Sequence, residues 1–263
     1  MESGKTRRLR RIIRSDGRTL IIAMDHGVSI GPVRGLENMQ NTVDQVVKGG
    51  VDAVLYHKGI AKHVDARTAG LIIHVSASSK LGGKPLLKVG VCTVKEAIRL
   101  GADAVSVHIN IGAAEEDKML ELLGGIAGQC DSYGIPLLAM MYPRGPNIKN
   151  EHEFELVNHA ARIGAELGAD VVKTVYTGEI DSFRSVVSSC PVPVVVAGGA
   201  RMSNDLEVLE LAENSIKAGA AGLSIGRNVF QHKSPEIMSR ALNMVVHEGR
   251  SARDALKLLE AAK

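Results

Sequence analysis

The chain has 263 residues, of which 45% are hydrophobic and 23% charged, and its formal net charge is only +3. A nucleic-acid-binding protein would show a sustained basic face or stacking aromatic side chains, but aromatic residues make up 3% of this chain and tryptophan is absent. No apolar run reaches the roughly 18 residues of a membrane span, and no signal-peptide core follows the basic start. The sequence therefore predicts a soluble, cytoplasmic protein that binds neither nucleic acid nor membranes.

The three cysteines, Cys92, Cys130 and Cys190, are widely spaced and form no pattern typical of metal sites or disulfide frameworks. His26 and His108 also lack metal-ligand spacing with other histidines, cysteines or carboxylates. We therefore expect a reducing compartment, no bound metal and no cofactor.

Residues 1–18 form a basic segment in which Leu9, Ile12 and Ile13 lie among lysines and arginines. The pattern predicts either a basic amphipathic arm or a helix that lies under the main domain with its charges in solvent, and we favour the helix. No linker divides the rest of the chain, so residues 19–263 are assigned to one domain. That length is normal for an α/β barrel, which typically has about 250 residues.

Strand and helix patterns alternate along this domain. Eight apolar runs predict strands at 19–24, 53–56, 71–75, 104–109, 136–141, 170–175, 193–197 and 221–225. Helical patterns lie between them at 39–48, 94–100, 115–132, 153–167, 182–187 and 205–217, and a last one covers 235–247. The alternation predicts an α/β fold in which a parallel sheet closes into a (β/α)8 TIM barrel.

A doubly wound open sheet is the alternative fold, but it usually has fewer strands and a glycine fingerprint after the first one. Here the first strand is followed by Asp25, His26 and Gly27. An internal repeat also favours the barrel, because four segments share a helix-ending glycine, a short turn and a strand. These segments are 50–54, 101–105, 168–172 and 219–223.

The sixth predicted strand carries a lysine where the pattern requires a hydrophobic residue. Lys173 lies among the β-branched Val171, Val172 and Val175, near the carboxyl end of a strand that should be covered on both faces. A lysine is almost never fully buried without a partner or a task, although its long stem can also bring the ammonium group to solvent. Burial lowers the pKa of an amine and prepares it to attack a carbonyl group and form an imine.

Residues just after each strand should form the active site, because barrel enzymes place it at the carboxyl ends of the strands. Those positions hold Asp25, His26, Lys58, His108, Tyr142, Gly198, Gly199, Gly226 and Arg227. The glycine loops after strands seven and eight expose backbone N–H groups, and Arg227 adds a positive charge. We interpret these two loops as a phosphate-binding site rather than as simple tight turns.

Tyr142 and Asp25 are the candidates for proton transfer. The Tyr142 phenol suits this task if a neighbouring cation lowers its pKa, and the alternative is a tyrosine that packs at the rim. Asp25 serves either as a base or as the cap of its turn. With Lys173 and the phosphate loops, these residues predict carbon–carbon bond cleavage or formation through a Schiff base on a phosphorylated ketose.

Five blocks of the sequence resemble the archaeal-type class I fructose-bisphosphate aldolase family and follow that family's order. They are 24–27, 142–145, 173–178, 198–199 and 226–231. Residues 25–29, 57–59 and 139–142 look like the branch of this family that makes 2-amino-3,7-dideoxy-D-threo-hept-6-ulosonate for aromatic amino acid biosynthesis.

The resemblance implies that Lys173 forms the Schiff base, Tyr142 donates a proton and Asp25 accepts one. It implies a transaldolase-like synthase that moves a three-carbon unit from 6-deoxy-5-ketofructose 1-phosphate to L-aspartate semialdehyde, in a ring-shaped homodecamer. Ala200 departs from the proline that relatives commonly carry after the two glycines, which leaves the rigidity of that loop open. The implied substrate-binding residues are Asp25, His26, Gly27, Val28, Ser29, Tyr142, Pro143, Arg144, Lys173, Gly198, Gly199, Gly226 and Arg227.

Three alternatives stay open. A fructose-1,6-bisphosphate aldolase uses the same lysine chemistry but must hold a phosphate at each end of its substrate, for which Lys58, Arg144 and Lys149 are available. A thiolase of the same family would need coenzyme A, for which the sequence shows no dedicated site. A non-catalytic phosphate-binding barrel is the third alternative.

Overall fold

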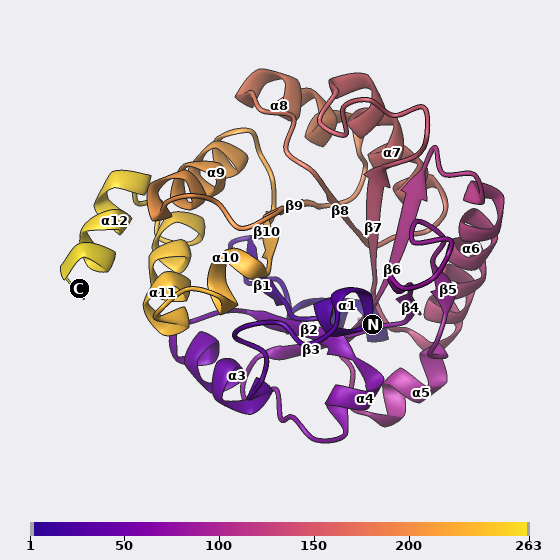
Figure 1. Ribbon diagram of the computed structural model, residues 1–263, viewed down its shortest axis with the longest axis horizontal. Helices are drawn as coiled ribbons and strands as arrows, with labels where there is room; N and C mark the ends of the chain where they lie inside the picture. The colour runs from indigo at the N-terminus through magenta and orange to yellow at the C-terminus, as the bar shows by residue number, and fades with distance from the viewer. Residues whose placement is uncertain (1–2, 262–263) are drawn as a thin grey trace.

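Eight parallel strands close into a barrel and helices cover its outside in the computed structural model, which describes residues 3–261 (Figure 1). Each strand pairs with its neighbours in the chain, and β1 pairs with β10 to close the ring. The TIM-barrel prediction is confirmed, and every predicted strand overlaps a barrel strand. These strands are β1 (Thr19–Ala23), β2 (Ala53–His57), β3 (Gly70–His74), β6 (Ala104–Ile111), β7 (Leu137–Pro143), β8 (Val171–Thr174), β9 (Val194–Ala197) and β10 (Gly222–Ile225).

The predicted helices are all present, with ends that differ by a few residues at most. They are α3 (Met39–Lys48), α5 (Val94–Arg99), α6 (Glu116–Tyr133), α7 (Phe154–Glu166), α8 (Ile180–Ser189), α9 (Asp205–Lys217) and α11 (Pro235–Val246). The elements that the sequence patterns missed are short or peripheral. They are α2 (His26–Ile30), α4 (Lys58–Ala61), α10 (Arg227–Phe230), α12 (Ala252–Ala261) and a hairpin of β4 (Ser76–Ala77) and β5 (Val89–Gly90). The helix favoured for the N-terminal segment is present as α1 (Gly4–Leu9).

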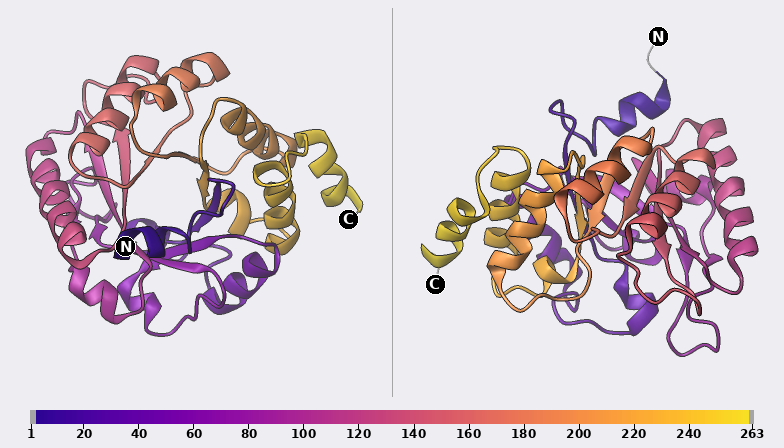
Figure 2. Two further views of the ribbon diagram at one scale, coloured as in Figure 1. Left: turned by 180° about the vertical axis from the view of Figure 1, so that it is seen from behind. Right: turned by 90° about the horizontal axis from the view of Figure 1, so that it is seen from above.

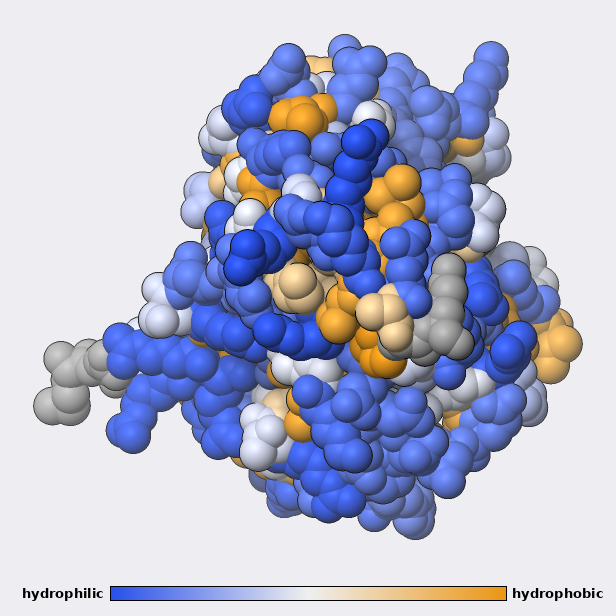
Figure 3. Space-filling model, turned by 90° about the vertical axis from the view of Figure 1, so that its left-hand side faces the viewer, coloured by the Kyte–Doolittle hydropathy of each residue, from blue (hydrophilic) through white to orange (hydrophobic). Residues whose placement is uncertain are grey.

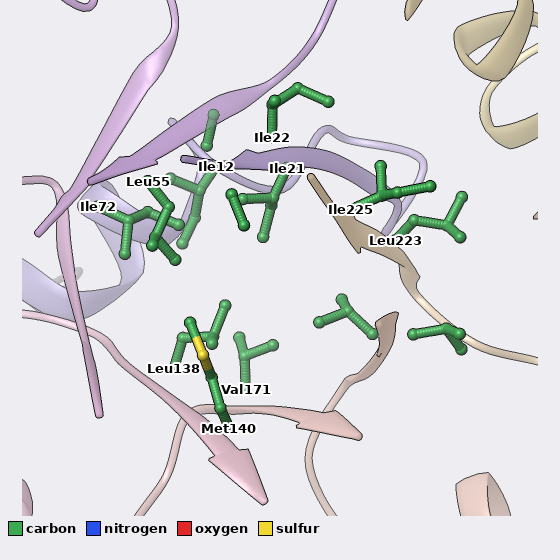
Figure 4. Packing of buried hydrophobic residues seen from close by; sticks show 14 of the residues in the cluster. Ile12, Ile21, Ile22, Leu55, Ile72, Leu138, Met140, Val171, Leu223 and Ile225 are labelled. Atoms are coloured by element: carbon green, nitrogen blue, oxygen red, sulfur yellow. The ribbon is translucent and has the colours of Figure 1, made fainter. Parts of the chain in front are cut away.

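Aliphatic side chains fill the inside of the barrel. In Figure 4, Leu138, Met140 and Val171 point toward Ile21 on the opposite side of the ring. Ile12, from the N-terminal segment, is 1% exposed, and the Thr19 hydroxyl donates to its backbone carbonyl. The N-terminal segment therefore contributes a residue to the core at the amino ends of the strands.

The repeated segments have a clear structural role at this end of the barrel. In three of the four repeats, the residue before the strand is an aspartate whose carboxylate accepts the backbone N–H of the neighbouring strand. Asp52 accepts from Leu20 (2.6 Å), Asp103 from Leu71 (2.9 Å) and Asp170 from Leu137 (2.8 Å).

The N-terminal segment lies across these aspartates, and α1 is visible at one end of the barrel in Figure 2. The cations that face the aspartates pair as Lys5 with Asp170 (2.9 Å), Arg11 with Asp103 (2.9 Å) and Arg14 with Asp52. The expectation of solvated charges is therefore wrong for Lys5, whose side chain is 18% exposed, whereas Arg11 and Arg14 remain in contact with solvent while they pair. Residues 1–2 of the segment lie outside the described part of the chain.

No helix within residues 3–261 is long and apolar enough to cross a membrane. Figure 3 shows a face of the molecule on which hydrophilic residues predominate and hydrophobic ones form small groups. Cys92, Cys130 and Cys190 are all buried and free.

Candidate active site

A cavity of about 1140 Å³ lies at the carboxyl ends of the barrel strands. Ten of the residues expected to bind substrate line it. They are Asp25, His26, Ser29, Tyr142, Arg144, Lys173, Gly198, Gly199, Gly226 and Arg227. Among the described residues, the remaining three candidates, Gly27, Val28 and Pro143, lie outside this lining.

Lys58 and Lys149 are also outside the lining. The Lys58 ammonium group pairs with Glu96 at 3.0 Å instead. Of the three cations considered for a second phosphate site, only Arg144 faces the cavity. His108, whose strand continues to Ile111, does line it.

Lys173 projects from β8 into the cavity and is only 6% exposed. It lies beside Met140 of β7 and Val195 of β9, both of which are buried. Burial lowers the pKa of Lys173 to about 8, although the carboxylate of Asp25 acts in the opposite direction. At pH 7, roughly a tenth of the molecules then carry the uncharged amine, the form that attacks a carbonyl group.

Tyr142 lies on the same face of β7 as Met140, because alternate residues of a strand share a face. It is therefore about 7 Å further along the barrel than the residue that pairs with Lys173. The Arg144 guanidinium group lies 4.5 Å from the centre of the Tyr142 ring. Burial nevertheless outweighs this cation and raises the pKa of Tyr142 above its ordinary value, so the phenol keeps its proton and suits proton donation.

Asp25 follows β1 and precedes α2, but its side chain makes no capping hydrogen bond. The interpretation of Asp25 as a cap is therefore wrong. Burial raises the pKa of Asp25, but His74 and His26, when they are protonated, and Lys173 outweigh it and hold this pKa below its usual range. Asp25 is thus ionised and available to accept a proton.

His74, which the sequence analysis missed, packs against Asp25 from β3. Its Nε2 atom lies 3.8 Å from Asp25 Oδ2, and its Nδ1 atom is 2.8 Å from the Ser106 hydroxyl. Burial lowers the pKa of His74 to about 3, so the imidazole is neutral at pH 7. The lasting positive neighbour of Asp25 is therefore Lys173.

The glycine loops that follow β9 and β10 lie next to each other and line the cavity. A Cβ atom on Gly198 would lie 2.2 Å from Ile225, and one on Gly226 would lie 2.5 Å from the Ala23 carbonyl oxygen. Larger residues therefore do not fit at these two positions. Arg227 donates from Nη2 to the Gly199 carbonyl at 2.8 Å, and its buried Nε has no hydrogen-bond partner within the described structure.

Asn228 holds the first glycine loop in place. Its Nδ2 donates to the carbonyls of Gly198 (2.9 Å) and Ala200 (3.1 Å), and its Oδ1 accepts the Met202 N–H (2.7 Å). These bonds fix the loop at the position where alanine replaces the expected proline. Sequence reasoning missed Asn228 because it follows the glycine–arginine pair by one residue and carries no signal of its own.

Residues 3–261 contain no group of three or more histidine, cysteine or carboxylate side chains placed to bind a metal ion. The cavity does combine a buried amine, an ionised carboxylate, a protonated phenol and an arginine next to glycine loops. Such a set can form an imine, move protons and hold an anion.

Comparisons with known proteins agree with this chemistry. Residues 19–232 match the model of the DeoC/LacD family aldolases. The chain is 48% identical to the 2-amino-3,7-dideoxy-D-threo-hept-6-ulosonate synthase 1 of Archaeoglobus fulgidus over 93% of its own length and 91% of the relative's. It is 40% identical to the 2-amino-4,5-dihydroxy-6-oxo-7-(phosphonooxy)heptanoate synthase of Streptomyces griseus, over 91% and 89%.

A solved structure of an archaeal fructose-1,6-bisphosphate aldolase, with its catalytic lysine covalently bound to the carbinolamine intermediate, is also similar. The TM-score is 0.86 at 34% identity, over 92% of this chain and 98% of the other. The chain therefore belongs to the DeoC/LacD aldolase family and is an enzyme of its class I, Schiff-base-forming type.

Proposed function

We propose that the protein is a transaldolase-like synthase that makes 2-amino-3,7-dideoxy-D-threo-hept-6-ulosonate, a step of aromatic amino acid biosynthesis. The observation that carries the proposal is Lys173, a buried amine with a pKa of about 8 in a cavity shared with Asp25 and Tyr142. Two relatives that are 43% and 48% identical to the chain and are named as synthases of this product support the choice.

The product's name defines the substrates. The ketone is at C6, the carboxylate at C1 and the amino group at C2. An aldol reaction joins the carbon next to a ketone to an aldehyde carbon, so the new bond is C4–C5. Carbons C5–C7 are then the transferred unit, and C1–C4 come from L-aspartate semialdehyde. We assign the donor as 6-deoxy-5-ketofructose 1-phosphate.

In the first half of the reaction, the Lys173 amine attacks the C5 ketone of the donor, and water leaves to give an iminium ion. The donor's C3 hydroxyl group then loses its proton to Asp25, and the C3–C4 bond breaks. Its electron pair forms an enamine on Lys173, and a three-carbon aldehyde phosphate departs.

In the second half, the enamine attacks the aldehyde of L-aspartate semialdehyde while Tyr142 protonates the aldehyde oxygen. Asp25 returns its proton to Tyr142, and water then releases the product from Lys173. The high pKa of Tyr142 and the low pKa of Asp25 support this division of roles.

Fructose-1,6-bisphosphate cleavage is the alternative function. It is favoured by the glycine loops with Arg227, which suit a phosphate close to the ketone that reacts with Lys173. The product made by the Streptomyces griseus relative carries such a phosphate, on C7 beside the C6 ketone. The proposed synthase and the alternative therefore differ in the donor substrate, and both form a Schiff base on Lys173.

Borohydride trapping tests the proposal directly. The enzyme is incubated with either 6-deoxy-5-ketofructose 1-phosphate or fructose 1,6-bisphosphate, reduced, and examined by peptide mass spectrometry for a sugar adduct on Lys173. L-aspartate semialdehyde should discharge the adduct before reduction and give a seven-carbon product. An adduct from fructose 1,6-bisphosphate alone, unaffected by L-aspartate semialdehyde, would establish the aldolase instead.

The proposal extends to a cytoplasmic homodecamer that binds phosphorylated ketose and aldehyde substrates, with residues 1–18 as a basic arm docked under a catalytic domain of residues 19–263. Free, buried cysteines and the family resemblance support it. Size-exclusion chromatography with light scattering measures the number of subunits.

A further inference from the structure

The cavity has a second cationic side that the predicted site did not include. Lys88 lines the cavity from the β4–β5 hairpin, which is inserted between β3 and β6. In the ring of eight strands, β3 lies four places from β9, and β6 lies four places from β10. The loops after β9 and β10 carry the glycines and Arg227. Lys88 and the glycine loops therefore approach the cavity from opposite sides of the barrel.

Lys88 has no carboxylate partner among the described residues. Its ammonium group donates to the Ser78 hydroxyl and, at 3.3 Å, to the Pro85 carbonyl, both of which are neutral. On the same hairpin, Lys84 pairs with Glu115 at 3.0 Å. Burial and the nearby Arg144 both lower the pKa of Lys88, whereas the charge of Asp25 acts in the opposite direction. Arg144 pairs with Glu151 but still repels Lys88, and an anion bound beside Lys88 would offset that repulsion.

The hairpin that carries Lys88 is fixed to the barrel. Asn110 of β6 donates from Nδ2 to the Leu86 carbonyl at 2.6 Å, and the Lys80 N–H donates to the Ser29 carbonyl at 3.0 Å. The first contact anchors the hairpin two residues from Lys88, and the second joins it to α2 at the rim. The lysine is thus held in place before any ligand binds.

We propose that Lys88 is a specificity-determining residue that binds, in turn, the phosphate of the departing aldehyde and the carboxylate of the incoming one. This inference rests on the proposed function. With the donor's C5 on Lys173, the departing fragment carries its phosphate at the end far from the imine. The incoming aldehyde carries its carboxylate at the corresponding end, and one enamine must meet both aldehydes in the same place.

The test compares a charged and a neutral acceptor on one enzyme. Hydroxyacetone, which has no phosphate, loads Lys173, and the acceptors are succinic semialdehyde and butanal, four-carbon aldehydes with and without a carboxylate. Replacing Lys88 by methionine (Lys88→Met) should lower kcat/KM for succinic semialdehyde and L-aspartate semialdehyde by about ten- to a hundredfold, the usual effect of losing a charged hydrogen bond. The value for butanal should not change.

Two further variants separate charge from packing. Lys84→Met removes a lysine of the same hairpin that pairs outside the cavity, and it should leave both acceptors unaffected. Lys88→Arg keeps the cation and should restore most of the preference for the charged acceptor. Lys88→Met should also raise the KM for 6-deoxy-5-ketofructose 1-phosphate, whose departing fragment carries the phosphate.

Borohydride trapping of hydroxyacetone on Lys173 shows that the variant is folded and that the first half of the reaction is intact. Equal losses for succinic semialdehyde and butanal in Lys88→Met, or no loss for either, would overturn the inference. If the unmodified enzyme forms no adduct with any donor, the proposed function itself fails, and the two failures are therefore distinguishable.

Discussion

At the amino ends of the strands, Asp52, Asp103 and Asp170 each accept a backbone N–H and pair with a cation of the N-terminal segment. At the carboxyl ends, by contrast, neither Lys173 nor Lys88 has a carboxylate within ion-pair distance in the described chain. Charged groups are present at both ends of the same barrel. At the amino ends the buried aspartates are matched with cations, whereas these two lysines of the cavity are not.

This difference between the two ends corresponds to two roles: the charges at the amino ends stabilise the fold, and those at the carboxyl ends serve catalysis. Matched charges at the amino ends join the strands to one another and to the N-terminal segment, as expected of the end of a barrel that serves stability. Buried charges without close partners at the carboxyl ends have shifted pKa values and meet a partner only when a substrate binds. Substitutions at the two ends should therefore affect different measurements.

The largest effect should come from Lys173→Met. Loss of a covalent nucleophile commonly lowers kcat by a factor on the order of 10⁴ or more, and we expect this variant to fall in that range. Its thermal stability should be unchanged or higher, because a buried cation without a close partner is removed. Lys58→Met, at another strand end but paired with Glu96 outside the cavity, should keep full activity.

Asp52→Ala should instead lower stability and leave kcat per folded molecule unchanged. The substitution leaves the Leu20 N–H, Arg14 and His247 without their shared acceptor. Removing one partner of a buried ion pair typically costs about 3–5 kcal/mol in the free energy of unfolding. Chemical denaturation measures the loss, and Asp44→Ala, which removes an exposed pair with Arg67, should leave the unfolding midpoint nearly unchanged.

The sequence was sufficient to predict the strands, because most of them are nearly continuous apolar runs, which are typical of a buried parallel sheet. It was also sufficient for Lys173, since a lysine within such a run is conspicuous. The pKa of Tyr142 required the structure. A nearby arginine is visible in the sequence, but the extent to which the ring is buried, which decides the direction of the shift, is not.

Partners that are distant in the chain account for the other omissions. The aspartates of the repeat and the basic residues 1–18 were both recognised, but their pairing joins segments up to 165 residues apart. Lys88 was missed because it lies in a hairpin inserted after β3 rather than directly at a strand end. His74 was missed because it is the last residue of β3, whose other residues are apolar, so that the whole segment was interpreted as a buried strand.

The pKa of Lys173 tests whether Asp25 acts on this lysine at the carboxyl ends of the strands. Asp25 raises this pKa, so Asp25→Asn should move it below about 8, and the uncharged fraction at pH 7 should rise by up to about tenfold. Labelling of Lys173 by a small acetylating reagent across pH, read by peptide mass spectrometry, follows the amine independently of catalysis. A midpoint that stays the same or rises would show that Asp25 does not act on Lys173.

The smallest effect should be a change in the pH dependence of stability at the amino end. Burial lowers the pKa of His247, but hydrogen bonds to Asp52 and Asp16 outweigh burial and raise this pKa above its ordinary value. The imidazolium form therefore stabilises the fold fully below about pH 6.5, and this stabilisation is lost as pH rises through the folded-state pKa.

His247→Gln should remove that loss, which we expect to be about 1 kcal/mol, the usual size of one such hydrogen bond. Urea midpoints at pH 6 and pH 8 measure it, and the two midpoints should differ less in the variant than in the unmodified protein. The pH profile of Lys173 labelling should be identical in both, because His247 and Lys173 lie at opposite ends of the barrel. If the variant's urea midpoints changed with pH as much as those of the unmodified protein, another group would be responsible for the dependence.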